Sequence, residues 1–259
     1  MGIYRNFLAR SLGLAFKATH EEDLKMTKIS TEEKSRLKGL GFITNKNTDC
    51  FSARVITGNG RLSEEEITHI AKAAGKYGDG HIVLTTRLSI EIPGIPYENI
   101  EPFTEYLNQG GFETGGTGPK VRPIVCCKGT TCQFGLLDSY GLTKKIHERF
   151  YLGYHDVVLP HKFKIAVGGC PNNCVKPTLN DVGIMGWRNG YKMFIGGRFG
   201  KSYAIGQPLN HIFEDEESLL KAIENAILIF KEHGKKGERF SATIERLGFG
   251  TIERMILSV

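Results

Sequence analysis

Four cysteines in two close pairs constrain this chain more than any other feature of its sequence. Cys126 and Cys132 are separated by five residues in VCCKGTTCQFG, and Cys170 and Cys174 by three residues in GGCPNNCVKP. Both segments are rich in Gly, Pro, Thr and Asn, which let a backbone turn tightly around a small inorganic group. Two loops that together bring four thiolates are the usual holders of a [4Fe–4S] cluster. The pattern therefore predicts an iron–sulfur protein.

Two other interpretations of these cysteines stay open. Structural zinc also binds four cysteines, although about two to four residues usually separate its paired ligands. The cysteines could also be free thiols buried in a core. Cys127 follows Cys126 directly and, used in its place, would leave four residues before Cys132. Cys50 stands alone and is expected to be an ordinary core residue.

The charge and the cysteine content of the chain limit its partners and its compartment. The 259 residues have a net charge of +6, from cations that recur singly within apolar, strand-like segments. A nucleic-acid-binding protein usually gathers its cations on one face or in one stretch, so we expect an enclosed anionic ligand and no nucleic acid. Six cysteines are too few for a disulfide-stapled scaffold of this length. We therefore expect a cytoplasmic protein.

The amino-terminal segment, MGIYRNFLARSLGLAFKATH, is expected to form an amphipathic helix that docks on the body of the protein. A signal peptide would need a longer uninterrupted apolar core and a small-residue cleavage site. No apolar run in the chain reaches the roughly 18 residues that suggest a membrane span. We therefore expect no membrane partner.

The hydrophobic periodicity divides the chain into three regions: a helical segment over residues 1–48, a ferredoxin-like domain over 49–114 and a cysteine-bearing domain over 115–259. In the second region, CFSARVITG predicts a strand, and a helix follows with Ser63 as N-cap and Glu66 completing a capping box. HIVLTTRLSIEIPGI predicts one or two strands that end at Pro93-Gly94, and the next helix runs from Tyr97 to Gln109. This order is typical of a ferredoxin-like α+β domain.

In the third region, VRPIVCC and HKFKIAVGG are expected to be extended segments that lead into the two cysteine pairs. DVGIMGW and YKMFIGG predict two strands joined by a turn at Asn189-Gly190. Helices are expected over 133–150, from Asp215 to His233, and from Gly237 onward. The predicted fold class is α+β, a ferredoxin-like domain followed by an α/β domain that holds the cysteines.

Several motifs together resemble the sirohaem-containing nitrite and sulfite reductases. They are the two cysteine spacings and the segments LTTRLSIEIPGI, VRPIVCCKGTTC, LPHKFKIAVGGCPNNC, DVGIMG and GERFSATIERLG. The resemblance runs from about Cys50 to Gly248 and is closest to the catalytic subunit of the anaerobic, clostridial-type sulfite reductases. It implies that the third region binds both sirohaem and a [4Fe–4S] cluster.

The resemblance also implies roles for individual residues. Cys174 would join the cluster to the sirohaem iron, and the other three irons would be held by Cys126, Cys132 and Cys170. The substrate anion would lie among four cations, Arg87, Arg122, Lys162 and Lys164, while Arg54 would face the macrocycle. Lys162 and Lys164 are two residues apart, so on an extended chain they point to the same side.

The implied activity is the six-electron reduction of sulfite to sulfide, with the reduction of nitrite to ammonia as the nearest alternative. A non-catalytic iron–sulfur electron-transfer subunit and a zinc-stapled binding module are the other hypotheses. Longer relatives contain this unit twice, so we expect a homodimer or a heteromeric complex. An external donor, a ferredoxin or a flavin or iron–sulfur subunit, would supply the electrons.

Overall fold

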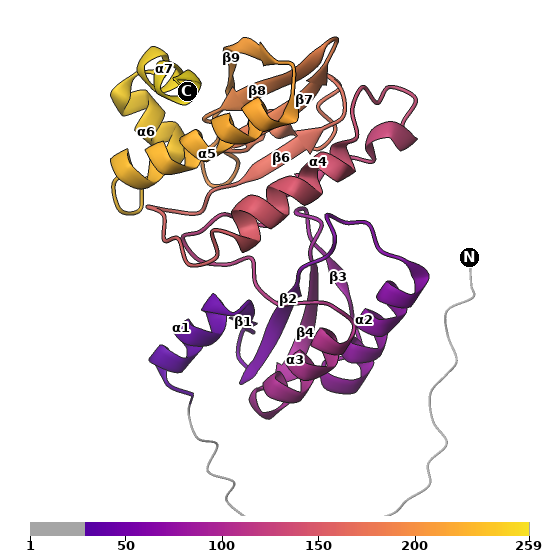
Figure 1. Cartoon of the computed structure of the whole chain (residues 1–259). Coiled ribbons are helices and arrows are strands. Elements are labelled where there is room, and N and C mark those ends of the chain that lie inside the picture. Colours follow the sequence, from indigo (N-terminus) through magenta and orange to yellow (C-terminus); the bar gives the residue numbers. More distant parts are fainter. Residues whose placement is uncertain (1–28, 259) are drawn as a thin grey trace, which may run out of the picture.

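The computed structural model describes residues 29–258, which form two halves, each built on its own β-sheet (Figure 1). The amphipathic helix expected at the amino terminus lies outside the described residues. Within residues 29–258, every helix is too short or too polar to cross a lipid bilayer.

The first half is a four-stranded antiparallel sheet in the order β1-β2-β4-β3, with helices packed against it. Its strands are β1 (Phe42–Thr44), β2 (Cys50–Val55), β3 (Val83–Leu84) and β4 (Ile90–Pro96). Its helices are α1 (Thr31–Gly39), α2 (Glu64–Tyr77) and α3 (Ile100–Gln109), the last preceded by a short 3₁₀ turn, η1 (Tyr97–Asn99). The strands and helices bury a core that includes Phe51, Ile92 and Phe103.

Helix α2 begins where its sequence signals predict. The Ser63 side chain accepts a hydrogen bond from the Glu66 N–H, and the Glu66 carboxylate accepts one from the Ser63 N–H. The helix ends before Gly78, whose N–H donates to the Ala74 carbonyl. Its buried residues, Ile70, Ala73 and Ala74, belong to the hydrophobic core that the helix shares with the sheet.

The second half is a five-stranded mixed sheet in the order β5-β6-β7-β8-β9. Its strands are β5 (Val125–Cys126), β6 (Ile165–Gly168), β7 (Val182–Trp187), β8 (Gly190–Ile195) and β9 (Gln207–Phe213). The pairs β5–β6 and β6–β7 are parallel, whereas the pairs β7–β8 and β8–β9 are antiparallel. The parallel part places the carboxyl ends of β5 and β6 at the same edge of the sheet.

Helices cover this second sheet and close its core (Figure 1). They are α4 (Ser139–Ile146), which continues as a π-helical segment η3 (His147–Leu152), α5 (Glu216–His233), α6 (Phe240–Leu247) and α7 (Phe249–Leu257). One short 3₁₀ turn, η2 (Gly129–Thr131), lies in the first cysteine loop, and a second, η4 (Pro177–Leu179), follows the second cysteine loop. Ion pairs from Arg149 to Glu217 (2.8 Å) and Glu224 (3.2 Å) join η3 to α5.

The structure corrects three of the expected elements. Residues 42–44, expected to be helical, form β1, since buried Phe42 pairs with Ala53 at the sheet edge. Strand β4 continues through Pro93-Gly94, because the register shift against β2 leaves both residues in a bulge. Strand β9 was not expected at all.

The glycine-rich segment 111–120, which connects the halves, makes contacts with both of them. The Gly115 N–H donates to the Arg54 carbonyl (3.0 Å), and Val55 and Thr114 form an isolated β-bridge. The Tyr151 hydroxyl accepts from the Gly116 N–H (3.1 Å). These contacts fix the segment against both halves and make it one wall of a cavity.

Candidate active site

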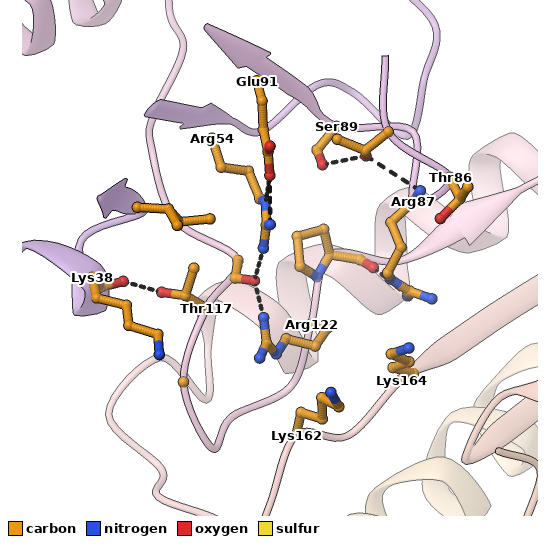
Figure 2. A pocket seen from close by; sticks show the side chains of 15 residues that line it. Lys38, Arg54, Thr86, Arg87, Ser89, Glu91, Thr117, Arg122, Lys162 and Lys164 are labelled. Carbon is orange, nitrogen blue, oxygen red and sulfur yellow. Dashed lines mark hydrogen bonds and ion pairs between the residues drawn. The ribbon is translucent and has the colours of Figure 1, made fainter. Parts of the chain in front are cut away.

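One cavity of about 410 Å³ is lined by residues of both halves, and all five basic residues singled out from the sequence line it. These are Arg54, Arg87, Arg122, Lys162 and Lys164. Figure 2 shows their side chains around a common space. Residues more than a hundred positions apart in the chain are therefore neighbours here.

Four stretches of backbone position the five basic residues. Arg54 belongs to β2, and Arg87 lies in the turn between β3 and β4. Arg122 follows Val121, which forms a parallel β-bridge with Phe163. Phe163 is fully buried, so the residues on either side of it, Lys162 and Lys164, both point toward the cavity.

Arg54 and Arg122 share one backbone acceptor. The Arg54 Nη1 donates to the Gly116 carbonyl (2.9 Å), and the Arg122 Nη1 donates to the same oxygen. The Arg54 Nε and Nη2 also donate to Glu91 Oε1 at 3.0 and 2.6 Å (Figure 2). Glu91 is the one carboxylate among the described residues that line the cavity.

Arg87 reaches from the first half into the second. Its Nη1 donates to the Asn180 side-chain oxygen (2.9 Å), and its Nη2 donates to the Pro123 carbonyl (2.7 Å) and, more weakly, to that of Ile165 (3.3 Å). These bonds hold the guanidinium plane rigidly at the boundary between the sheets. They also link the cavity to Pro123 before β5, to Ile165 at the start of β6 and to Asn180 before β7.

The cations in the cavity depress one another's pKa values. Burial, and then the nearby Arg87, Arg239 and Lys162, lower the pKa of Lys164 to about 8, while Asp181 opposes the shift. Burial lowers the pKa of Arg87 to about 10, and burial and Arg54 do the same for Arg122. The positive charge of the cavity therefore exceeds the negative charge that the side chains lining it supply.

Two atoms indicate that the missing partner is a ligand with acceptor oxygens. The Nε atoms of Arg87 and Arg122 are buried and have no hydrogen-bond partner among the described residues. A sixth cation, Lys38 of α1, also lines the cavity. Its position in an exposed helix offers no sequence signal that would single it out.

Three residues that were also not singled out from the sequence, Asp181, Arg239 and Asn180, hold the basic residues of the cavity in place. The buried Asp181 carboxylate accepts from the Lys164 N–H (2.9 Å) and from the Arg239 Nη2 (2.7 Å). Arg239 belongs to the motif GERFS just before α6, so a carboxyl-terminal helix is tied to the backbone of Lys164. Asn180, next to Asp181, holds Arg87.

The two cysteine loops begin at the carboxyl ends of the neighbouring parallel strands β5 and β6. Backbone bonds join the loops, since the Leu136 N–H donates to the Gly169 carbonyl (2.8 Å). Gly186 of β7 lies beneath this contact, where a side chain would meet the Gly169 carbonyl. The structure therefore brings the two cysteine segments together, as the sequence predicts.

The cysteine side chains differ in their surroundings. Cys126 is buried, which raises its pKa to about 11, whereas Cys132 and Cys170 are half-buried and Cys174 is exposed. Across residues 29–258, no three Cys, His, Asp or Glu side chains are grouped closely enough to hold a metal ion. The loops are adjacent, but their four predicted ligands do not converge in this arrangement.

A separate cavity of about 490 Å³ lies beside the first cysteine loop. Both Cys126 and Cys127 line it, together with Arg61 from the first half. None of the five basic residues that line the anion cavity belongs to its lining. Cys126 and Cys127 therefore line a different space from the five basic residues.

Family models match both halves of the chain. The nitrite and sulphite reductase 4Fe-4S domain matches residues 117–258, which is more than half of the chain. The nitrite/sulfite reductase ferredoxin-like half domain matches residues 43–110. The ferredoxin-like α+β fold expected from the sequence is thus confirmed, and so are the two kinds of cofactor that this family implies.

Individual relatives agree with these matches. An assimilatory-type sulfite reductase of Nitratidesulfovibrio vulgaris is 29% identical over 76% of this chain and 88% of its own length. The coenzyme F420-dependent sulfite reductase of Methanocaldococcus jannaschii is 26% identical over 74% of this chain, which spans only 39% of that relative. The structure of the Mycobacterium tuberculosis NirA protein has the same fold, with a TM-score of 0.78 at 18% identity over 88% of this chain and 46% of that one.

Proposed function

The chain belongs to the nitrite and sulphite reductase family, and we propose that it is the catalytic chain of a sulfite reductase, which takes sulfite to sulfide with six electrons. The observation that carries the proposal is the cavity of six cations and one carboxylate, with two buried guanidinium N–H groups that have no partner in the described part of the chain. A small oxyanion, together with a carboxylate-rich macrocycle, would supply the missing acceptors.

The residues present fit the two cofactors. The unpaired Nε atoms of Arg87 and Arg122, and the mutually depressed pKa values around them, suit sirohaem, which carries many carboxylates. Thiols in adjacent glycine-rich loops at two strand ends suit a [4Fe–4S] cluster. Its ligands would be Cys132, Cys170, Cys174 and one member of the Cys126-Cys127 pair.

The cofactors, when bound, would supply the electrons and an iron that accepts the anion. The chain would do the rest: Arg87 and Arg122 bind and orient the oxyanion through charge-assisted bonds, each contributing about 1.5–3 kcal/mol. Lys164, with its pKa lowered to about 8, can both hold a proton beside the anion and release it near neutral pH. Lys162 adds a second ammonium group on the same side, and its pKa is also lowered, first by burial and then by Arg239 and Arg122.

We also propose that the catalytic unit is a two-fold dimer, in which the cysteine loops of one chain meet the basic cavity of the other. The separation of these two features within one chain supports this arrangement. The division into a ferredoxin-like domain ending at about residue 114 and a cofactor domain belongs to the same proposal. A ferredoxin or a flavin or iron–sulfur subunit would deliver the electrons.

Spectroscopy and turnover test this function together. Anaerobically purified, iron-replete protein should show sirohaem absorption bands and contain acid-labile sulfide, and it should reduce sulfite with a chemical reductant. Faster turnover of nitrite than of sulfite would reassign the substrate within the family. A cluster without sirohaem bands would favour an electron-transfer subunit, and zinc without labile sulfide would favour a stapled binding module.

A further inference from the structure

Strand β5 ends between two adjacent cysteines, Cys126 and Cys127. Cys126 is the last residue of β5 and is paired with Val167 of β6. Cys127 is the first residue beyond β5, and its N–H donates to the Val167 carbonyl (3.2 Å). Both cysteines line the cavity beside the first cysteine loop, but Cys126 is held in the sheet whereas Cys127 lies in the loop that follows it.

Cys126 behaves as a core residue. Its exposed fraction is 6%, and it belongs to the hydrophobic core of the second half with Leu142 and Ile146 of α4. Its thiol has two polar neighbours among the described residues, the Asn59 carbonyl of the first half at 3.8 Å and the Thr143 side chain of α4. Among the described residues, no hydrogen bond joins its sulfur to the backbone of the second cysteine loop.

The sulfur of Cys127 lies between the two cysteine loops. It accepts a hydrogen bond from the Gly169 N–H at 3.0 Å, and Gly169 directly precedes Cys170. It also accepts from the Gly129 N–H of its own loop at 3.4 Å. Backbone N–H groups directed at a cysteine sulfur stabilise a thiolate and tune a cluster.

The space around Cys127 is kept open by glycine. A Cβ atom on Gly169 would lie 3.3 Å from the Cys127 sulfur and 3.2 Å from the Gly129 Cα, so a side chain there would crowd both loops. The Ser139 hydroxyl at the start of α4 holds the Cys127 carbonyl (2.8 Å). The backbone of Cys127 is thus anchored while its sulfur points toward the second loop.

We propose that Cys127, and not Cys126, is the first cysteine ligand of the [4Fe–4S] cluster. The ligand set is then Cys127, Cys132, Cys170 and Cys174, with four residues between the first two. Cys126 fills the core behind the site. This assignment rests on the proposed function, since it presupposes the cluster.

Single substitutions of the two cysteines test the assignment. Cys127→Ala and Cys126→Val are purified anaerobically and reconstituted with iron and sulfide, beside the unaltered chain. Iron and acid-labile sulfide per chain and the electron paramagnetic resonance signal of the reduced cluster are measured, all without reference to turnover. We expect the Cys126→Val protein to match the unaltered chain and the Cys127→Ala protein to lose most of its labile sulfide and its four-iron signal.

Folding is followed separately, because a core substitution can unfold a protein. Far-ultraviolet circular dichroism and thermal unfolding identify any misfolded variant, and Cys126→Ala then replaces Cys126→Val. As a further check on the unaltered apoprotein, alkylation followed by peptide mass spectrometry should find Cys127 modified faster than the buried Cys126.

The outcomes separate the assignment from the proposed function. A folded Cys126 variant that lacks the cluster, or a Cys127→Ala protein that keeps it, overturns the assignment and leaves the function intact. Faster alkylation of Cys126 than of Cys127 contradicts the assignment in the same way. An unaltered chain that takes up no labile sulfide overturns both.

Discussion

At the scale of single residues, Lys164 connects the electrostatics of the cavity to a measurable pH dependence. Its pKa is lowered to about 8, first by burial and then by Arg87, Arg239 and Lys162. The ammonium charge is therefore present below pH 8 and is lost as the pH rises through that value. Arginine, whose pKa is much higher, would stay charged throughout.

We expect the KM for sulfite to rise above pH 8 in the unaltered protein and to rise less in Lys164→Arg. The titration of sulfite itself affects both proteins equally, so the difference between their pH profiles reports Lys164. Steady-state kinetics between pH 6.5 and 9.5, roughly a range centred on that pKa, would measure it. Superimposable profiles would mean that Lys164 does not contact the anion.

A second effect of single side chains comes from the buried ion pair between Asp181 and Arg239. The side chain of Asp181 is fully buried and that of Arg239 is 6% exposed, so neither charge is solvated by water. Removing one member of such a pair leaves an uncompensated buried charge, which costs about 3–5 kcal/mol. Asp181 also accepts from the Lys164 N–H, so the damage should reach the cavity.

We predict that Asp181→Asn lowers the free energy of unfolding by about 3 kcal/mol and weakens sulfite binding. Chemical denaturation and binding measurements would show both effects. Glu33→Gln is the control, because it breaks the surface pair with Arg36 and should change neither quantity appreciably. A loss for Asp181→Asn as small as that of the control would contradict the structural role of this pair.

At the scale of elements, β7 supports the cysteine loops through a glycine. A Cβ atom on Gly186 would meet the Gly169 carbonyl oxygen and come within 3.0 Å of its carbon. Backbone cannot move aside as a flexible side chain can, so the loop that leads to Cys170 must shift. Gly169 also donates to the Cys127 sulfur, and the shift would therefore disturb both loops.

Gly186→Ala should accordingly reduce cluster content by several-fold and lower the thermal midpoint. Gly250→Ala is the matched control: Gly250 lies in α7 with nothing within 4 Å of an added Cβ, and alanine favours a helix by roughly 1 kcal/mol. Iron and labile-sulfide analysis of both proteins would separate the effects. Equal cluster content in the two variants would mean that the loops tolerate the displacement.

At the scale of the whole molecule, the proposed dimer makes a prediction about hybrids. A chain with Cys174→Ser lacks a cluster ligand, and a chain with Lys162→Ala and Lys164→Ala lacks anion-binding cations. If each site combines the cysteines of one chain with the cations of its partner, a hybrid has one intact site of two. Each parent dimer has none.

Co-expression with two affinity tags would isolate the hybrids. We expect about half of the unaltered activity per hybrid dimer and almost none in either parent dimer. Light scattering of the unaltered protein should give twice the mass of one chain. Hybrids as inactive as their parents, or a fully active monomer, would show that one chain contains the whole site.

The sequence by itself determined the elements whose signals are local. The capping box of Ser63 and Glu66 marks the start of α2, and the Asn189-Gly190 turn separates β7 from β8. Both signals are local: the capping side chains accept hydrogen bonds from backbone N–H groups three residues away, and Asn-Gly favours a tight hairpin turn. The motifs also indicated the family, since several short segments agree at once. Strand β9, with exposed residues and a proline, has no such local signal.

Only the tertiary structure decided which residues share a space. Arg54, Arg87 and Arg122 meet because β2, the β3–β4 turn and the segment before β5 converge at the boundary of two sheets. Likewise, the five-residue spacing favoured Cys126 over Cys127, whereas in the structure β5 ends at Cys126 and leaves Cys127 in the loop. The physical reason is that side-chain periodicity records burial along one element, whereas a site depends on contacts between elements that chain spacing does not encode.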